Sequence, residues 1–312
     1  MPFLPALASD TSRFVLGALC AVGTILIWAG WLVAMRVGMA ANLGVLDLIA
    51  LRFAVAGAIL FPVVLRRGWA LDRLRWPGLL AIVIGGGAAY NLSVGAGLIF
   101  APVAHASAFT QGVLPLTTAI VAAIMLKERL PRSRKFGIGL IMVGAVTIAG
   151  VSALALGRQS IGHLILVSAT LLWATYSVVL RRSRLDGLHA TAIAAVASCA
   201  VYLPIYLILV GPQRLLAAPW QEVLWQGAYQ GVLTALVSMV LYGYAVALIG
   251  PSASAAIISL GPVIAALLAI PILHEWPSLT DWIGIAVISA GVYLASGGPL
   301  PFTSASQPAR RP

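Results

Sequence analysis

Charge is scarce in this sequence. Asp, Glu, Lys and Arg make up only 9% of the 312 residues, whereas about a quarter of the residues in a soluble domain are charged. Hydrophobic residues make up 61%, and the mean hydropathy is +1.03. A helix needs roughly 20 apolar residues to cross the hydrocarbon core of a bilayer, and uncharged stretches of that length recur along almost the whole chain. The composition therefore predicts an all-α integral membrane protein.

Other absences exclude whole classes of site. The two cysteines, Cys20 and Cys199, fall inside apolar segments, so they predict neither a disulfide framework nor a thiolate metal site. The four histidines are scattered without HExxH spacing, and no metal or cofactor is expected. No GxxxxGK(S/T) motif is present, so the chain carries no P-loop ATPase domain. No nucleophile–base pair or carboxylate pair stands out, which disfavours an enzyme.

The positive charge does not indicate nucleic-acid binding. The 19 Lys and Arg against 8 Asp and Glu give a formal net charge of +11, which in a soluble domain would suggest a phosphate-binding face. Here these charges lie in short loops between apolar segments, so the partners we expect are the lipid bilayer and a small-molecule substrate.

Apolar runs between charged or Gly/Pro-rich breaks predict ten transmembrane helices. They lie near residues 15–37, 45–65, 77–98, 104–126, 135–152, 161–181, 188–210, 223–246, 252–273 and 280–297. The first is too long for a signal-peptide core and has a twin later in the chain, so we expect it to be retained.

The basic residues orient these segments. With the N-terminus in the cytoplasm, 15 of the 19 Lys and Arg fall in inner loops and tails, whereas only Arg36, Arg158 and Arg214 fall outside and Arg52 lies within the second segment. This bias predicts a plasma (bacterial inner) membrane protein with both termini, residues 1–14 and 298–312, in the cytoplasm. The second of these tails is Pro/Ser-rich and is predicted to be disordered.

The two halves of the chain resemble each other. Trp28 and Arg36 recur 145 residues later as Trp173 and Arg181, and "IMLKERLP" at 124–131 recurs as "IPILHEWP" at 270–277. Each repeat, 15–152 and 161–297, holds five segments, so the second must be inverted relative to the first. Inverted repeats typically form secondary transporters that work by alternating access around a central site. Inversion also explains why the basic residues around Glu128 are missing around its twin Glu275.

These features resemble the drug/metabolite transporter superfamily, in particular its ten-span EamA-type exporters, and within these the YddG-type exporters of aromatic amino acids. The resemblance rests on Trp28, the "LRF" at 51–53, the segment from Pro115 to "KER" at 127–129, and the Gly137/Gly144 pair. It implies a central cavity lined by segments 1, 3, 4, 6, 8 and 9, with segments 5 and 10 peripheral.

Aromatic and polar residues in mid-segment are the candidate substrate contacts. Trp28 and Trp31 share one helix face, as do their twins Trp173 and Tyr176, and such rings could stack on a flat ligand or attract an ammonium group. Ordinary helix packing is the alternative. An amide in hydrocarbon needs a partner or a wet cavity. The predicted contacts are Trp28, Trp31, Tyr90, Asn91, Gln111, Trp173 and Tyr176, and the predicted cavity or vestibule residues are His105, Ser107, Thr110, His163, Tyr229 and Gln230.

The remaining candidates are predicted to be structural. Arg52 is expected to approach Asp47 as an ion pair, and Glu128 to pair with a neighbouring basic residue or cap a helix. Small residues two turns apart predict close helix packing. This group comprises Arg52, Asp47, Glu128, Glu275, Pro115, Pro262, Gly137, Gly144, Gly284 and Gly291.

The sequence thus predicts an exporter of amino acids and related metabolites, with aromatic or apolar side chains preferred. No Asp or Glu lies near the middle of a segment, so facilitated diffusion, exchange, or coupling through histidine or an ion remain as mechanisms. Efflux or uptake of nucleobases or drug-like compounds is the alternative, and a membrane enzyme acting on lipid head groups is disfavoured.

Overall fold

The computed structural model describes residues 10–128, 131–154 and 157–297, which are helical throughout and contain no strand. The predicted disordered tail at 298–312 lies outside the described residues. The helices are α1 (Asp10–Ala40), α2 (Val45–Arg67), α3 (Leu71–Gly86), α4 (Ala88–Phe100), α5 (Val103–Ser107), η1 (Ala108–Gly112), α6 (Leu114–Leu126), α7 (Arg132–Leu154), α8 (Arg158–Ser183), α9 (Gly187–Leu209), α10 (Gln213–Ala217), α11 (Trp220–Gly227), η2 (Ala228–Val237), α12 (Ser238–Ile258), α13 (Gly261–Leu273) and α14 (Leu279–Ala295), where η marks π-helical turns.

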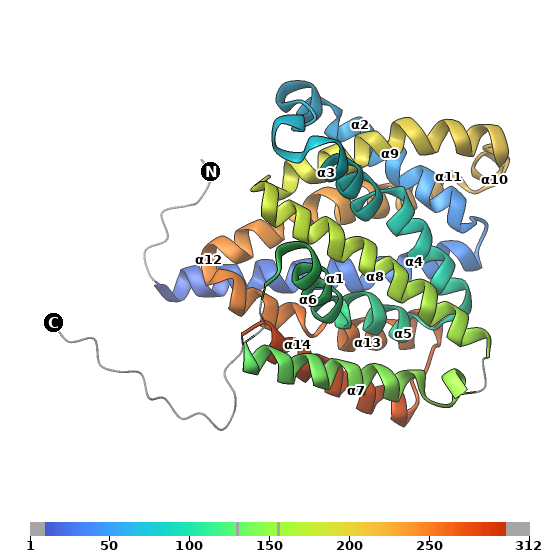
Figure 1. The fold of residues 1–312 in the computed structure, drawn as a ribbon. Helices are drawn as coiled ribbons and strands as arrows, with labels where there is room; N and C mark the ends of the chain where they lie inside the picture. The colour runs from blue at the N-terminus through green and yellow to red at the C-terminus, as the bar shows by residue number, and fades with distance from the viewer. Residues whose placement is uncertain (1–9, 129–130, 155–156, 298–312) are drawn as a thin grey trace.

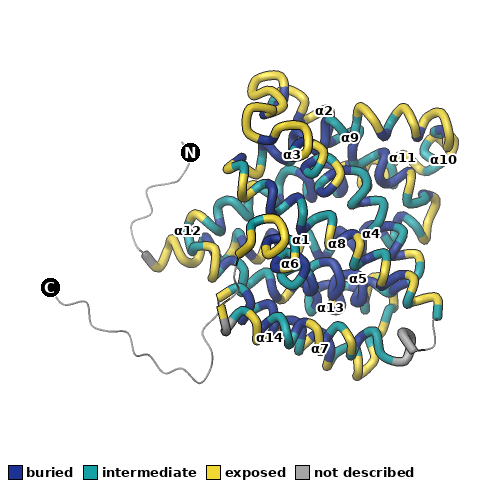
Figure 2. The backbone as a smooth tube through the Cα atoms, viewed as in Figure 1, coloured by how far each residue is buried: buried dark blue, intermediate teal, exposed yellow. Residues whose placement is uncertain are grey.

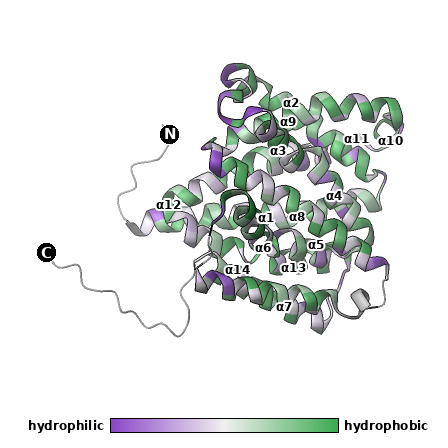
Figure 3. Ribbon diagram, viewed as in Figure 1, coloured by the Kyte–Doolittle hydropathy of each residue, from purple (hydrophilic) through white to green (hydrophobic). Residues whose placement is uncertain are grey.

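The helices have the length and composition of a membrane protein. Seven helical segments of the described residues are long and apolar enough to cross a bilayer, and α13 and α14 are shorter apolar helices. Hydrophobic residues run along the lengths of the helices, and most hydrophilic ones lie at helix ends (Figure 3). Buried residues line the inside of the bundle (Figure 2), while large apolar side chains such as Ile124, Val146 and Ile208 are more than two-thirds exposed. Such an outer surface suits lipid rather than water.

Two predicted spans are interrupted at matching places. In the first half, α5 and η1 end at Gly112, and α6 begins at Leu114 with Pro115 in its first turn. In the second half, the helix restarts after Gly250, whose φ is +82°, ends at Ile258, and is followed by α13 with Pro262 in its first turn. Proline is tolerated in a first helical turn because its missing N–H has no partner there. The interruptions place helix ends deep inside the bundle.

A third break divides α3 from α4 at Gly87. The backbone N–H of Ala88 donates to Ser198 Oγ of α9 at 3.0 Å, which replaces a bond lost at the break. A Cβ at Gly86 would lie 2.9 Å from Cδ2 of the Tyr176 ring. The glycine run therefore lets this helix bend close against α8 and α9.

Pairs of helices from the two halves pack together (Figure 1). α7 lies along α14 at one edge of the bundle, and α2 lies along α9 at the opposite edge. Between these edges, α1 packs on α12 and α13, and α8 packs on α4 and α6. The arrangement leaves α1, α4, α6, α8 and α12 around the centre.

Candidate functional site

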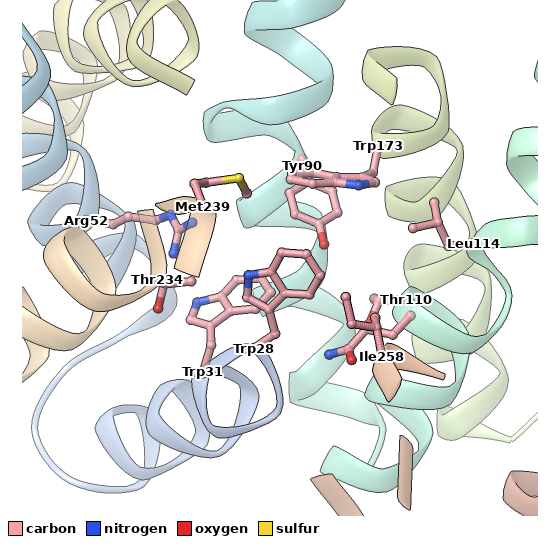
Figure 4. A pocket seen from close by; sticks show the side chains of 11 residues that line it. Trp28, Trp31, Arg52, Tyr90, Thr110, Leu114, Trp173, Thr234, Met239 and Ile258 are labelled. Atoms are coloured by element: carbon pink, nitrogen blue, oxygen red, sulfur yellow. The ribbon is translucent and has the colours of Figure 1, made fainter. Parts of the chain in front are cut away.

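The centre of the bundle holds a cavity of about 100 Å³. Elements from both halves of the chain contribute to its wall, including the π-helical turns η1 and η2, which often mark functional sites in helices. Its wall is mostly aromatic and apolar (Figure 4) and consists of Trp28, Trp31, Arg52, Tyr90, Thr110, Gln111, Leu114, Trp173, Thr234, Met239 and Ile258.

Aromatic rings form a row along this wall. The ring centroids of Trp31 and Tyr90 are 6.3 Å apart, with an angle of 30° between their planes. Tyr90 and Trp173 follow at 4.9 Å, and Trp173 and Tyr176 at 4.9 Å. Offset and tilted contacts at these distances are favourable. The row presents ring faces and edges from α1, α4 and α8 to a ligand in the cavity.

Hydrogen bonds fix the two tryptophans of α1. Trp28 Nε1 donates to Ser238 Oγ at 3.0 Å, and Trp31 Nε1 donates to Gln230 Oε1 at 2.7 Å. Gln230 Nε2 in turn donates to Gln226 Oε1 at 3.2 Å, and Gln226 Nε2 donates to the carbonyl of Ala34 at 2.8 Å. The indole rings are therefore held in place before any ligand binds, which lowers the entropy lost on binding.

Arg52 is the main departure from the sequence-based prediction. It does not pair with Asp47, because Asp47 Oδ1 accepts from Tyr206 Oη at 2.6 Å and Oδ2 accepts from the N–H of Gly44 at 2.7 Å. Arg52 instead points into the cavity, where its Cζ lies 5.2 Å from the centroid of the Trp31 ring and its Nη1 donates to the carbonyl of Gln230 at 3.2 Å. Segment 2 thus contributes to a cavity that the family resemblance had assigned to segments 1, 3, 4, 6, 8 and 9.

The cavity continues to one end of the bundle. A second chamber of about 560 Å³ shares Trp28, Gln111 and Trp173 with the first and extends along α8 to Arg181 and Arg184. The described part of its lining also includes Tyr176 and Tyr242. The end of the bundle marked by Arg181 and Arg184, called here the arginine end, is therefore open to the cavity.

The opposite end is closed by an ion pair. Arg36 Nε of α1 donates to Glu275 Oε1 at 3.0 Å, with side-chain exposures of 27% and 22%. Glu275 Oε2 accepts from the backbone N–H of Val103 at 2.8 Å, and Arg36 also donates to the carbonyl of Leu98. Glu275, which lacks basic neighbours in sequence, finds its partner 239 residues away. We call this end the glutamate end.

Two histidines close the same end. His105 Nδ1 lies 3.0 Å from His163 Nε2, and His105 Nε2 lies 2.9 Å from Asp281 Oδ1. Both histidine side chains are about 5% exposed, and the His163 ring stacks on Phe109. With His105 neutral, the distances fit a pattern in which His163 Nε2 donates to His105 Nδ1 and His105 Nε2 donates to the carboxylate of Asp281; with His105 protonated, both of its nitrogens donate, to Asp281 and to His163 Nε2. The hydrogen-bonded series His163–His105–Asp281 therefore joins α8, α5 and α14.

Removing the central member of this series should cost more stability than removing its end. His105→Leu leaves Asp281 Oδ1 and His163 Nε2 without their partner, and each buried polar group left unpaired costs about 1–3 kcal/mol. His163→Phe removes one hydrogen bond and keeps an aromatic ring against Phe109. In detergent, thermal unfolding should show a larger loss of Tm for His105→Leu than for His163→Phe. Equal losses would mean that the Asp281 contact contributes nothing.

The structure brings together most of the predicted contacts. Trp28, Trp31, Tyr90, Gln111 and Trp173 line the central cavity and Tyr176 lines its continuation. Among the predicted cavity or vestibule residues, Thr110 also lines the centre, and its Oγ1 donates to the carbonyl of Ala106 at 2.6 Å.

Other predicted contacts lie elsewhere. Asn91 is 1% exposed, donates through Nδ2 to the carbonyl of Gly87, and lines neither chamber. Ser107 is fully buried. Tyr229 lines a separate apolar groove with Trp225. Gln230 accepts the hydrogen bond from Trp31 Nε1 and thereby holds the indole ring in place. The sequence also did not single out four lining residues, Leu114, Thr234, Met239 and Ile258. Leu114 and Ile258 are apolar side chains at helix breaks, and in sequence such side chains give no signal that separates a cavity wall from ordinary packing.

The predicted structural residues hold helix junctions. Glu128 pairs with Arg181 at 2.9 Å, and both side chains are about half exposed. Pro115 and Pro262 stand in the first turns of α6 and α13. The four glycines, Gly137, Gly144, Gly284 and Gly291, lie in the contact between α7 and α14.

A bundle of apolar helices around a cavity that is open at one end and closed at the other is the architecture of a membrane transport protein. The sequence matches the EamA-like transporter family over residues 15–150 and again over residues 160–297. The chain therefore belongs to the EamA-like transporter family, and thus to the drug/metabolite transporter superfamily.

Individual relatives are distant but cover nearly the whole chain. The probable terminal-alkyne amino-acid exporter of Streptantibioticus cattleyicolor is 28% identical over 92% of this chain and 96% of that protein. The uncharacterized inner membrane transporter YedA of Escherichia coli K12 is 29% identical over 90% of each chain. A solved crystal structure, 23% identical, covers 92% of this chain and 97% of its own with a TM-score of 0.57. The relatives' names point to transport rather than to enzymatic activity, and the last match supports the fold.

Proposed function

We propose that this protein is a secondary transporter that exports amino acids with aromatic or apolar side chains and related metabolites. The observation that carries this proposal is the row of four rings formed by Trp31, Tyr90 and Trp173 in the central cavity and Tyr176 in its continuation. Such rings stack on a flat side chain and exclude water from it. The name of the Streptantibioticus relative supports the amino-acid part, and the resemblance to YddG-type exporters supports the aromatic part.

The architecture we propose is ten membrane spans in two inverted repeats. Matching contacts support it, because α4 packs on α8 as α1 packs on α12, and α6 packs on α8 as α1 packs on α13. The family match over two consecutive ranges of similar length also supports it. Five spans in a repeat reverse the direction of the second copy, so each contact has a counterpart of opposite orientation.

The excess of basic residues places the arginine end in the cytoplasm in this proposal. The structure would then show the transporter open to the cytoplasm, with the glutamate end closed toward the outside. Rocking of the two repeats about Trp28, Trp31 and Trp173 would close the arginine end and open the other, which moves a bound molecule outward.

Nucleobases are the second candidate substrate, since a purine would stack on the same rings. Cationic drugs are disfavoured, because no Asp or Glu is found among the described residues that line the two chambers and Arg52 adds a positive charge to the centre. A membrane enzyme acting on lipid head groups is disfavoured because no nucleophile paired with a base is found among the lining residues that the structure describes.

Counterflow in proteoliposomes tests the proposal. Vesicles that contain the purified protein and unlabelled tryptophan should accumulate labelled tryptophan, and threonine or adenine should compete less well. Trp173→Ala should lower the initial rate about tenfold, because it removes the central ring of the row. Trp220→Ala is the matched control, since Trp220 is 68% exposed at the surface.

Two results would contradict the proposal. If adenine is exchanged and tryptophan is not, the transporter class stands and the amino-acid assignment is wrong. If tryptophan exchange is equally fast in Trp173→Ala and Trp220→Ala, the aromatic row is not the substrate site.

A further inference from the structure

The guanidinium of Arg52 has no acidic partner among the described residues. No ion pair includes it, and the nearest acidic residue in sequence, Asp47, is satisfied by Tyr206 and Gly44. One donor, Nη1, bonds to the carbonyl of Gln230, whereas a guanidinium has several N–H donors in a planar fork. The remaining donors have no protein partner in the described residues and belong to a side chain that lines the cavity.

Charge along the route has a single sign. Among the described lining residues of both chambers, Arg52 stands at the centre and Arg181 and Arg184 stand at the open end, with no carboxylate among them. Arg181 alone is neutralised, by Glu128 outside the cavity. An unpaired charge in a low-dielectric interior is costly. The Arg52 guanidinium therefore attracts an anion that enters the cavity and repels a cation.

The wall beside Arg52 suits a flat ring. The guanidinium carbon lies over the Trp31 ring at 5.2 Å, and Trp31 stacks against Tyr90, which contacts Trp173. Figure 4 shows the guanidinium on the same side of the cavity as the two tryptophans of α1. A molecule with a carboxylate at Arg52 can therefore lay an aromatic ring along the row.

We propose that the cavity takes aromatic carboxylates as a class, with the carboxylate at Arg52 and the ring along Trp31, Tyr90 and Trp173. This inference rests on the proposed function for the location of the site and extends its substrates. An α-amino group is not required, because the lining offers no carboxylate to bind an ammonium. Arylacetates and aryl 2-oxo acids should then be substrates along with aromatic amino acids, whereas aromatic amines should not.

Three indole compounds with different charges test this class. Indole-3-acetate, tryptophan and tryptamine share one ring and differ in carboxylate and ammonium. Binding is measured by thermal shift of the detergent-purified protein, and transport by efflux of labelled indole-3-acetate from proteoliposomes. Indole-3-acetate should bind within about threefold of tryptophan, and tryptamine at least about tenfold more weakly, since a carboxylate–guanidinium hydrogen-bonded pair is among the stronger polar contacts.

Variants of Arg52 then test whether the carboxylate of the ligand binds at this side chain. Arg52→Gln should lose at least about tenfold in affinity for indole-3-acetate, and Arg52→Lys should lose less, because lysine keeps the charge without the planar fork. Arg66→Gln on the same helix is the matched control, since Arg66 is exposed at the end of α2 and should bind like the unaltered protein.

The outcomes separate this inference from the proposed function. If indole-3-acetate binds and moves through Arg52 while tryptophan does not, the aromatic-carboxylate class stands and the amino-acid assignment fails. If tryptamine binds as tightly as indole-3-acetate, or if indole-3-acetate does not bind, the inference is overturned. The comparison of ligands on the unaltered protein decides this even if Arg52→Gln fails to fold.

Discussion

A leucine at Gly144 is expected to force α7 away from α14 and to lower the stability of the protein sharply. A Cβ at Gly144 would lie 2.7 Å from the carbonyl oxygen of Gly284 and 2.9 Å from the backbone N of Ile288. A Cβ at Gly291 would lie 2.7 Å from the carbonyl oxygen of Gly137. These neighbours are backbone atoms, so they cannot turn aside as a side chain would. Only glycine lets the two helices approach this closely.

The cost of this substitution can be isolated within one helix. Gly139 also lies on α7, and a Cβ there would meet nothing within 4 Å. Gly144→Leu should lower the free energy of unfolding by about 2 kcal/mol or more, as overpacking does, which corresponds to several degrees in Tm. Gly139→Leu should leave Tm unchanged or raise it slightly, since leucine favours the helix. Equal losses in the two variants, measured by thermal unfolding in detergent, would show that helix contact is not the cause.

Spacing along a helix predicted contacts that depend on one face. The Gly137/Gly144 and Gly284/Gly291 pairs are seven residues apart, which is close to two turns, so their side of the helix is fixed by local geometry. The same argument put Trp28 and Trp31, and Trp173 and Tyr176, on shared faces, and the structure places all four along the two chambers. The helical period depends only on local geometry, so residues that share one helix face can be predicted from the sequence.

The spacing of residues along a helix does not show which face of that helix points toward the cavity. Asn91 and Tyr90 are adjacent, and neighbouring residues on a helix point about 100° apart, so the spacing alone does not show which of them lines the cavity. The structure selects Tyr90, while Asn91 bonds back to Gly87 beside the break between α3 and α4. That break depends on Ser198, a residue 110 positions away from Ala88. Long-range contacts of this kind cannot be deduced from a period.

The position of Arg52 was missed for a similar reason. An ion pair with Asp47 was a sound expectation on one helix, but Tyr206 and the N–H of Gly44 satisfy that carboxylate first. Tyr206 belongs to α9, so the competing hydrogen bond becomes visible only when α2 and α9 pack together. A long side chain released from its expected partner then reaches the cavity.

The two ion pairs at the ends of the bundle are expected to exchange roles during transport. Arg36 and Arg181 are twins in the repeat, as are Glu128 and Glu275, and each arginine pairs with the glutamate of the other half. At the closed glutamate end, the side chains are 27% and 22% exposed, whereas at the open arginine end they are 52% and 43% exposed. Under the proposed inverted symmetry, the other state would bury Arg181 with Glu128 and expose Arg36 with Glu275.

Neutralising either glutamate should therefore shift the protein in opposite directions. Glu275→Gln weakens the closed glutamate end, because Arg36 and the N–H of Val103 lose a charged acceptor. Glu128→Gln instead weakens the state in which the arginine end is closed. Labelling of a cysteine at Ala104, which lines the glutamate end and is 3% exposed, reports the equilibrium once Cys20 and Cys199 are replaced by serine.

Adding Glu275→Gln to the Ala104→Cys protein should make labelling about tenfold faster, a shift that corresponds to about 1.4 kcal/mol for a partly exposed pair. Adding Glu128→Gln should instead make labelling slower than in the Ala104→Cys protein alone. Both variants should lower counterflow, because each traps the protein on one side of the cycle. Arg67→Gln is the matched control, since its pair with Asp186 is about half exposed and neither residue is among the described lining of the two chambers. Labelling that changes in the same direction in both glutamate variants would show that the two pairs do not alternate. Opposite changes in the labelling rate would mean that an equivalent Arg–Glu pair stands at each end of the bundle and that only one of the two pairs is closed in each state. Such alternation is the physical basis of alternating access in an inverted repeat.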